Sequence, residues 1–151
     1  MANLTVQAVM RTETERRHPR TLDLRVDAVP RSISTARHAV ARLFDPELQI
    51  PTELAGDVLL LVSELVTNAV LHARTTVHVS ARIDLGRILV AVADADPENP
   101  PRPAEPGATA TSGRGMRLVE LLATTWGVEL GHTSKVVWFE VRYTPDPIDL
   151  R

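Results

Sequence analysis

Cysteine is absent from the sequence, and its absence sets the first limits on the chemistry of the chain. Without cysteine there is no disulfide framework and no zinc site built on thiolates. Aromatic residues make up only 3% of the chain, and its 17 basic residues include a single lysine, Lys135. The formal net charge is −2, so the basic excess of a nucleic-acid-binding surface is missing and we expect no direct nucleic-acid partner.

Long apolar runs are missing as well. No run reaches the roughly 18 residues that a membrane span needs, and the N-terminus lacks the apolar region of a signal peptide. We therefore expect no membrane partner and a cytoplasmic location. The length of 151 residues, with 44% hydrophobic and 24% charged residues, is typical of one globular domain. We expect that domain to span residues 21–143, between a flexible tail at 1–20 and a C-terminal tail at 144–151.

Hydrophobic periodicity predicts regular elements in the order β-α-α-β-β-α-β-β. Two of the strands flank Gly86, which indicates a β-hairpin. Runs of strands and hairpins favour a mixed, mostly antiparallel sheet with helices on one face, which is a two-layer α/β sandwich. The predicted strands are 22–26, 77–83, 88–93, 125–130 and 135–143, and the predicted helices are 32–44, 53–73 and 116–123.

Prolines gather between the second hairpin strand and the last predicted helix. Five of the 11 prolines fall between Pro97 and Pro106, among alanines and threonines, so no regular structure is predicted there. At about 19 residues the segment is too long for a plain connector, and long loops in compact domains are usually lids or binding loops. We therefore interpret residues 94–115 as a lid.

A polar stripe interrupts the most apolar helix, at 53–73. Asp57, Glu64, Asn68 and His72 are separated by seven, four and four residues, so they share one helix face. A solvent-exposed face is one explanation. The alternative is a lined site, because Asn is a mediocre helix former that a free surface would not select. The Glu and Asn oxygens suit a hard cation such as Mg²⁺, which takes few protein ligands alongside phosphate and water.

Two further motifs border the expected lid. Asp94 ends a predicted strand, where its carboxylate either starts a turn or accepts hydrogen bonds from a ligand's amino group. Gly113, Arg114 and Gly115 open the last helix, and glycines at a helix start let the backbone N–H groups approach an anion. Such a G-x-G pair is also common as a simple glycine-rich helix start, so on its own it leaves both interpretations open.

Together these pieces resemble a known family. The run LLLVSELVTNAVLHA, the Asp at a strand end, the block GRGMRLVELLATTWGV and the strand KVVWFEV follow one another in this order. They resemble the GHKL ATP-binding fold, which is the Bergerat or histidine kinase-like ATPase fold. More narrowly, they resemble the bacterial anti-sigma factor serine/threonine kinases. The resemblance covers roughly residues 21–143.

The resemblance implies a role for each matching residue. It implies that Glu64 is the general base or water-positioning carboxylate, and that Asn68 binds the Mg²⁺ that bridges the nucleotide phosphates. His72 ends the same motif and belongs to the same cofactor-binding set. Asp94 matches the aspartate that accepts from the adenine amino group. Gly113, Arg114 and Gly115 match the lid residues that approach the phosphates.

Two positions depart from the family pattern, both at the adenine end. The glycines that usually follow the adenine-reading aspartate are absent, because the sequence there is Asp94-Ala95-Asp96-Pro97. The last strand often carries a threonine that supports adenine binding, and we align Val136 with that threonine. The phosphate end matches the family motif.

The activity implied by the resemblance is that of an anti-sigma factor type regulator. It would bind ATP and Mg²⁺ and phosphorylate a serine or threonine of an anti-sigma factor antagonist, thereby controlling release of a sigma factor. The implied partners are the antagonist, the sigma factor and a second copy of the chain in a homodimer. The alternative, favoured by the two departures, is a non-catalytic regulator that senses nucleotide or binds only protein, with a degenerate adenine site.

Overall fold

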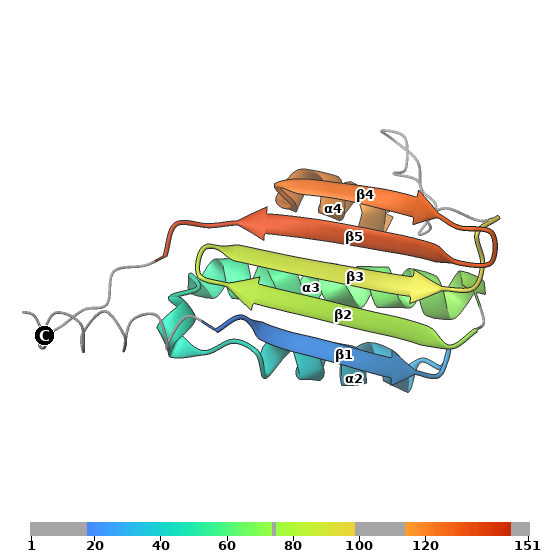
Figure 1. The fold of residues 1–151 in the computed structure, drawn as a ribbon, viewed down its shortest axis with the longest axis horizontal. Helices are drawn as coiled ribbons and strands as arrows, with labels where there is room; N and C mark the ends of the chain where they lie inside the picture. Colours follow the sequence, from blue (N-terminus) through green and yellow to red (C-terminus); the bar gives the residue numbers. More distant parts are fainter. Residues whose placement is uncertain (1–17, 74, 99–113, 146–151) are drawn as a thin grey trace, which may run out of the picture.

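The computed structural model describes residues 18–73, 75–98 and 114–145. Figure 1 shows one layer of strands in front of one layer of helices. The expected N-terminal tail lies almost wholly outside the described residues, as do most of the expected lid and most of the C-terminal tail. The remaining expectation, an α/β two-layer sandwich with its helices on one face, is confirmed.

The sheet has five strands in the order β1-β2-β3-β5-β4. All four pairings are antiparallel, so the parallel component of the expected mixed sheet is not found among the described strands. Gly86, with a φ of 85°, makes the tight turn between β2 and β3. The strands are β1 (Arg20–Val26), β2 (Val77–Asp84), β3 (Arg87–Asp94), β4 (Thr125–Leu130) and β5 (Lys135–Arg142).

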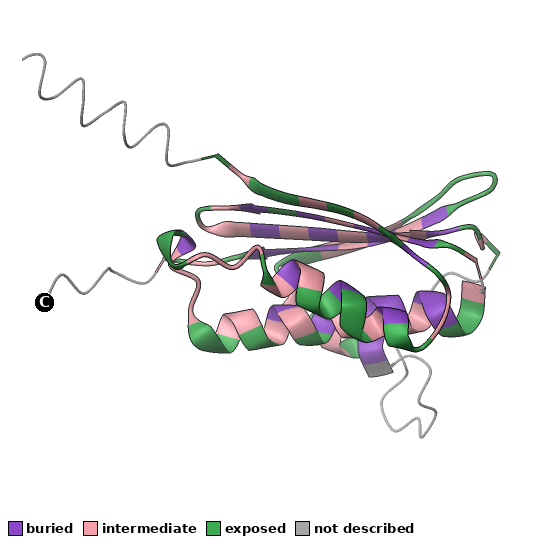
Figure 2. Cartoon of the chain, turned by 90° about the horizontal axis from the view of Figure 1, so that it is seen from below, coloured by how far each residue is buried: buried purple, intermediate pink, exposed green. Residues whose placement is uncertain are grey.

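Helices cover one face of this sheet, called here the inner face (Figure 2). They begin and end within a few residues of the predicted positions. The last five residues of the second predicted helix form a π-helical turn instead of continuing the α-helix. The elements are α2 (Arg31–Ala41), η1 (Pro46–Leu48), α3 (Thr52–Asn68), η2 (Ala69–Ala73) and α4 (Arg114–Leu122).

The core forms where α3 packs on the inner face. Every second residue of β2, β3 and β5 is buried against the helices, because successive side chains of a strand point to opposite faces. Phe139 from β5 and Leu61 from α3 are the largest side chains that are fully buried there. Thr52–Ala73 is also long and apolar enough to cross a membrane by length and composition, contrary to the expectation above, but core helices pass the same test.

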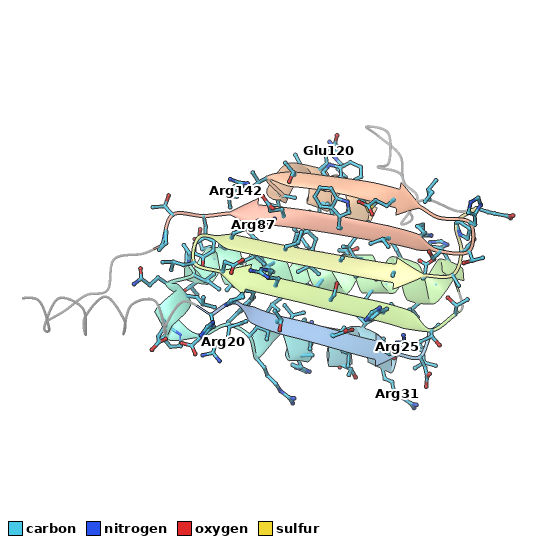
Figure 3. All side chains as sticks on the ribbon, in the orientation of Figure 1. Arg20, Arg25, Arg31, Arg87, Glu120 and Arg142 are labelled. Atoms are coloured by element: carbon cyan, nitrogen blue, oxygen red, sulfur yellow. The ribbon has the colours of Figure 1, made fainter. Side chains whose placement is uncertain are left out.

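The outer face of the sheet carries an ion cluster. Arg87 Nε donates to Glu140 Oε2 at 2.6 Å, and Arg142 Nε donates to Glu140 Oε1 at 2.8 Å. Figure 3 shows the two arginines at the same end of β3 and β5. These hydrogen bonds, first from Arg142 and then from Arg87, hold the pKa of the Glu140 carboxyl below its usual value of 4.5.

Replacing Glu140 by glutamine should therefore weaken the fold in a pH-dependent way. At pH 7 we expect Glu140→Gln to lose about 1 kcal/mol of unfolding free energy, the upper range for pairs with exposed arginines. Because folding lowers the pKa, this difference is complete above pH 4.5 and disappears as the pH falls through the lower folded value. Urea unfolding of both proteins at neutral and acid pH measures it. A difference that is unchanged in acid would contradict the prediction.

Candidate functional site

The first residues of α4 lie directly against the polar stripe of α3. Gly115 is buried there, and a Cβ added to it would lie 2.5 Å from Glu64 Oε2 and 3.0 Å from the Glu64 Cβ. Met116 and Val119 are fully buried and anchor α4 in the core. The N–H groups of the first helical turn have no partners within the helix. The fold therefore places potential anion-binding donors beside the Glu64 carboxylate.

The polar stripe is only partly open to solvent. Asp57, Glu64 and Asn68 all lie in α3 and are half-buried, whereas His72 lies in η2 and is exposed. The π-helical turn after Asn68 changes the hydrogen-bonding pattern from i→i+4 to i→i+5. The structure thus brings Glu64 and Asn68 onto one half-buried helix face, whereas His72 lies on the exposed π-helical turn that follows.

Two hydroxyls beside the stripe are used by the helix itself. Ser63 Oγ donates to the Leu59 carbonyl at 3.0 Å, and Thr67 Oγ1 donates to the Ser63 carbonyl at 2.6 Å. A hydroxyl that donates its hydrogen bond to the preceding turn of its own helix has no second proton to donate to a ligand. The side chains of the stripe within α3 that remain for chemistry are those of Asp57, Glu64 and Asn68, of which Glu64 lies against α4.

Asp94 is buried at the end of β3 and is held on both carboxylate oxygens. Its Oδ1 accepts from the backbone N–H of Asp96 at 2.8 Å, and its Oδ2 lies 3.4 Å from Lys135 Nζ. Lys135 begins β5, and the two residues stand opposite each other in the antiparallel register. The inner face therefore ends in an ion pair that joins the predicted adenine-reading carboxylate to the single lysine of the chain.

Val136, which we aligned with the family threonine, does not lie beside Asp94. In the register of β3 and β5, Val136 pairs with Ala93, which points to the outer face, whereas Lys135 pairs with Asp94 on the inner face. Lys135 is the residue that sequence reasoning missed. The alternation of buried and half-buried residues along β5 could have identified it, because Lys135 lies two residues before the buried Val137 and therefore points to the same face.

The remaining predicted residues are placed only in part. Gly113 lies outside the described residues, and of Arg114 the structure describes the backbone, which begins α4. Asp94 ends β3, and Glu64 lies in α3. Since β3 contacts η2, which continues α3, and α3 contacts α4, the elements around both residues meet at the C-terminal half of α3. Whether these residues act together on one ligand stays a prediction.

A divalent cation would find few protein ligands in this arrangement. Within residues 18–73, 75–98 and 114–145 no group of three or more His, Cys, Asp or Glu side chains could hold a metal. Asn68 and Glu64 offer oxygen atoms, which are the ligands that Mg²⁺ takes, with nucleotide phosphates and water completing its shell. The donor chemistry of Glu64 and Asn68 fits a Mg²⁺–nucleotide complex.

The contact between Gly115 and Glu64 predicts an energetic coupling. In Gly115→Ala the new Cβ displaces the Glu64 side chain, so we expect destabilisation by about 1–3 kcal/mol. In a Glu64→Ala background the same change should cost at least about 1 kcal/mol less, as measured by a urea-unfolding double-mutant cycle.

Gly56→Ala is the matched control for this cycle. A Cβ on Gly56 meets nothing within 4 Å, so this helical substitution should stabilise the protein by about 0.5–1 kcal/mol in either background. Additive effects of Gly115→Ala and Glu64→Ala would show that α4 does not rest on the Glu64 side chain.

Comparison with known proteins agrees with this geometry. A family model described as the histidine kinase-like ATPase domain matches residues 26–141. Among solved structures, the crystal structure of the RsbU and RsbW domains of Rv1364c from Mycobacterium tuberculosis matches with a TM-score of 0.62 and 20% sequence identity. The match covers 81% of this chain and 32% of that one, so the chain spans about a third of its length.

At this level of identity the structural match shows the fold alone, which is the expected GHKL fold. No curated protein matches the sequence significantly. The family model, however, covers well over half of the 151 residues. The chain therefore belongs to the histidine kinase-like ATPase domain family.

Proposed function

We propose that this nucleotide-binding domain is an ATP- and Mg²⁺-dependent protein serine/threonine kinase that acts on an anti-sigma factor antagonist. The family supplies the coarse function, and the motif resemblance across residues 21–143 supplies the narrower one. The observation that carries the proposal is the close approach of Gly115 to Glu64. It puts a carboxylate next to the start of α4, and helix starts are common phosphate-binding sites.

The chain's own residues have modest tasks in this reaction. Phosphoryl transfer depends mainly on positioning and on charge neutralisation, and Mg²⁺ supplies that neutralisation when bound. The Asn68 amide oxygen would hold the cation, and the first turn of α4 would orient the phosphates. Glu64, half-buried on the same helix face, would align the acceptor hydroxyl and take its proton. Asp94 would accept from the adenine amino group.

Three protein partners belong to the proposal. The antagonist would present the acceptor hydroxyl, and a sigma factor would bind a second surface, in the cytoplasm. A second copy of the chain is the third partner. Its support is apolar surface on the outer face of the sheet, which no helix covers. There Trp138 lies against Gly127, and Leu89 is close to Trp138 in the register of β3 and β5. All three residues are half-buried. Apolar surface of this kind is typical of protein contact sites.

A non-catalytic regulator is the second candidate function. The observation that favours it is the ion pair of Asp94, because both oxygens of the adenine-reading carboxylate already have partners. The sequence Asp94-Ala95-Asp96-Pro97, which lacks the glycines that usually follow this aspartate in the family, adds to this interpretation. Such a protein would capture its partners with weak nucleotide dependence or none.

The kinase proposal predicts loss of transfer in one glutamate variant. With Mg²⁺, ATP and a candidate antagonist, Glu64→Gln should lower the phosphorylation rate by about 10²–10⁴-fold while keeping ATP affinity, because it removes the base and keeps the shape. Transfer of radiolabelled phosphate measures the rate. Glu53→Gln is the matched control, since Glu53 is an exposed residue of the same helix about 16 Å away along its axis. Equal rates for Glu64→Gln and wild type would refute the assigned role.

Calorimetric titration separates the two candidate functions. If the kinase proposal holds, wild-type protein binds ATP with Mg²⁺, and Asn68→Ala weakens binding with Mg²⁺ more than binding with EDTA, because the amide oxygen serves the cation. Absence of heat and of any thermal shift at millimolar ATP would instead favour the nucleotide-free regulator. Tight binding without transfer to any antagonist would leave a nucleotide sensor.

A further inference from the structure

The pair of Asp94 and Lys135 is an exception on the inner face of the sheet. Among the described residues, four polar or charged side chains are buried, and only these two combine a charge with a position on the inner face. Their side chains are 3% and 5% exposed, and Lys135 Nζ lies 3.4 Å from Asp94 Oδ2. All other buried positions of β2, β3 and β5 on this face are apolar.

Stability gives little reason for such a pair. Removing two charges from water costs several kcal/mol for each ion, and well-packed apolar residues in their place are often as stable. Buried charges at the end of a core strand, next to proposed ligand-binding elements, are candidates for a functional role. The question is which ligand group needs a carboxylate and an ammonium side by side.

We propose that Lys135 is a base-reading residue, which donates to ring nitrogen N1 of adenine while Asp94 accepts from the neighbouring amino group. This inference rests on the proposed ATP site and adds a second contact to it. The adenine edge presents a donor and an acceptor next to each other, and the pair presents an acceptor and a donor in the matching order. Bases are read through hydrogen bonds to this edge in other buried sites.

Both side chains have the capacity for the extra bonds. An ionised carboxylate has about four lone-pair sites, and Asp94 uses one on Oδ1 for the Asp96 N–H and one on Oδ2 for Lys135. An ammonium group has three donors, and its contact with Asp94 needs no more than one of them.

Guanine and hypoxanthine test the order of the groups. Their edge carries an acceptor at position 6 and a donor at N1, the reverse of adenine. They could pair with the same two side chains only by shifting along their edge, with the carboxylate on N1–H and the ammonium on O6. The proposal therefore requires that ATP binds more tightly than inosine triphosphate.

The experiment compares ATP with analogues altered at single atoms, by calorimetry with Mg²⁺ on the full chain. Wild-type protein should bind 1-deaza-ATP about tenfold or more weakly than ATP, because a hydrogen bond from a charged donor is lost. It should bind 7-deaza-ATP as ATP, since N7 is not read. Lys135→Met should bind ATP and 1-deaza-ATP equally, because it keeps the side-chain length and removes the donor.

Val136→Thr is the matched control variant. It restores the aligned family threonine on the outer face and should keep the wild-type discrimination against 1-deaza-ATP. Equal wild-type affinity for ATP and 1-deaza-ATP, or tighter binding of inosine triphosphate, overturns the proposal for Lys135 and leaves the ATP site in place. This wild-type comparison decides even if Lys135→Met does not fold. If no adenine nucleotide binds wild-type protein, the proposed ATP site fails and the Lys135 contact fails with it.

Discussion

The packing of α3 on the inner face of the sheet controls the position of every candidate site residue. Leu61 and its apolar neighbours face the strands, so the half-buried stripe with Glu64 and Asn68 turns to the rim of the interface. On the other side of the interface, burial of Val92 and Val137 fixes the parity of their strands. The same hydrophobic contact therefore leaves Glu64 and Asn68 partly exposed and buries Asp94 and Lys135.

The end of α3 shows how a local irregularity serves this arrangement. The α-helix stops at Asn68, the proposed Mg²⁺ ligand, and continues as a π-helical turn that contacts β3. Single π-helical turns are rare in proteins overall, but those that occur are often found at functional sites. Here the turn carries His72, which is exposed, whereas Glu64 and Asn68 in the preceding α-helix are half-buried.

Local patterns predicted the elements well, because hydrophobic periodicity reports burial within one segment. The order of strands and helices and the shared face of Glu64 and Asn68 follow from such patterns. The contact of Gly115 with Glu64 joins distant segments, and no local pattern predicted it. Val136 points away from Asp94 because successive residues of a strand alternate between the two faces, and the same parity would have assigned Lys135 to the inner face. The π-helical turn leaves no clear trace in residue type.

The single lysine gives the protein an unusual chemical property. An acylating reagent has only two amines to attack, the N-terminus and Lys135, and the second is shielded while its side chain is buried beside Asp94. The rate of acylation at that one position therefore measures how often this end of the sheet opens. Mass spectrometry of the tryptic peptide that contains acylated Lys135 would follow that motion without any mutation.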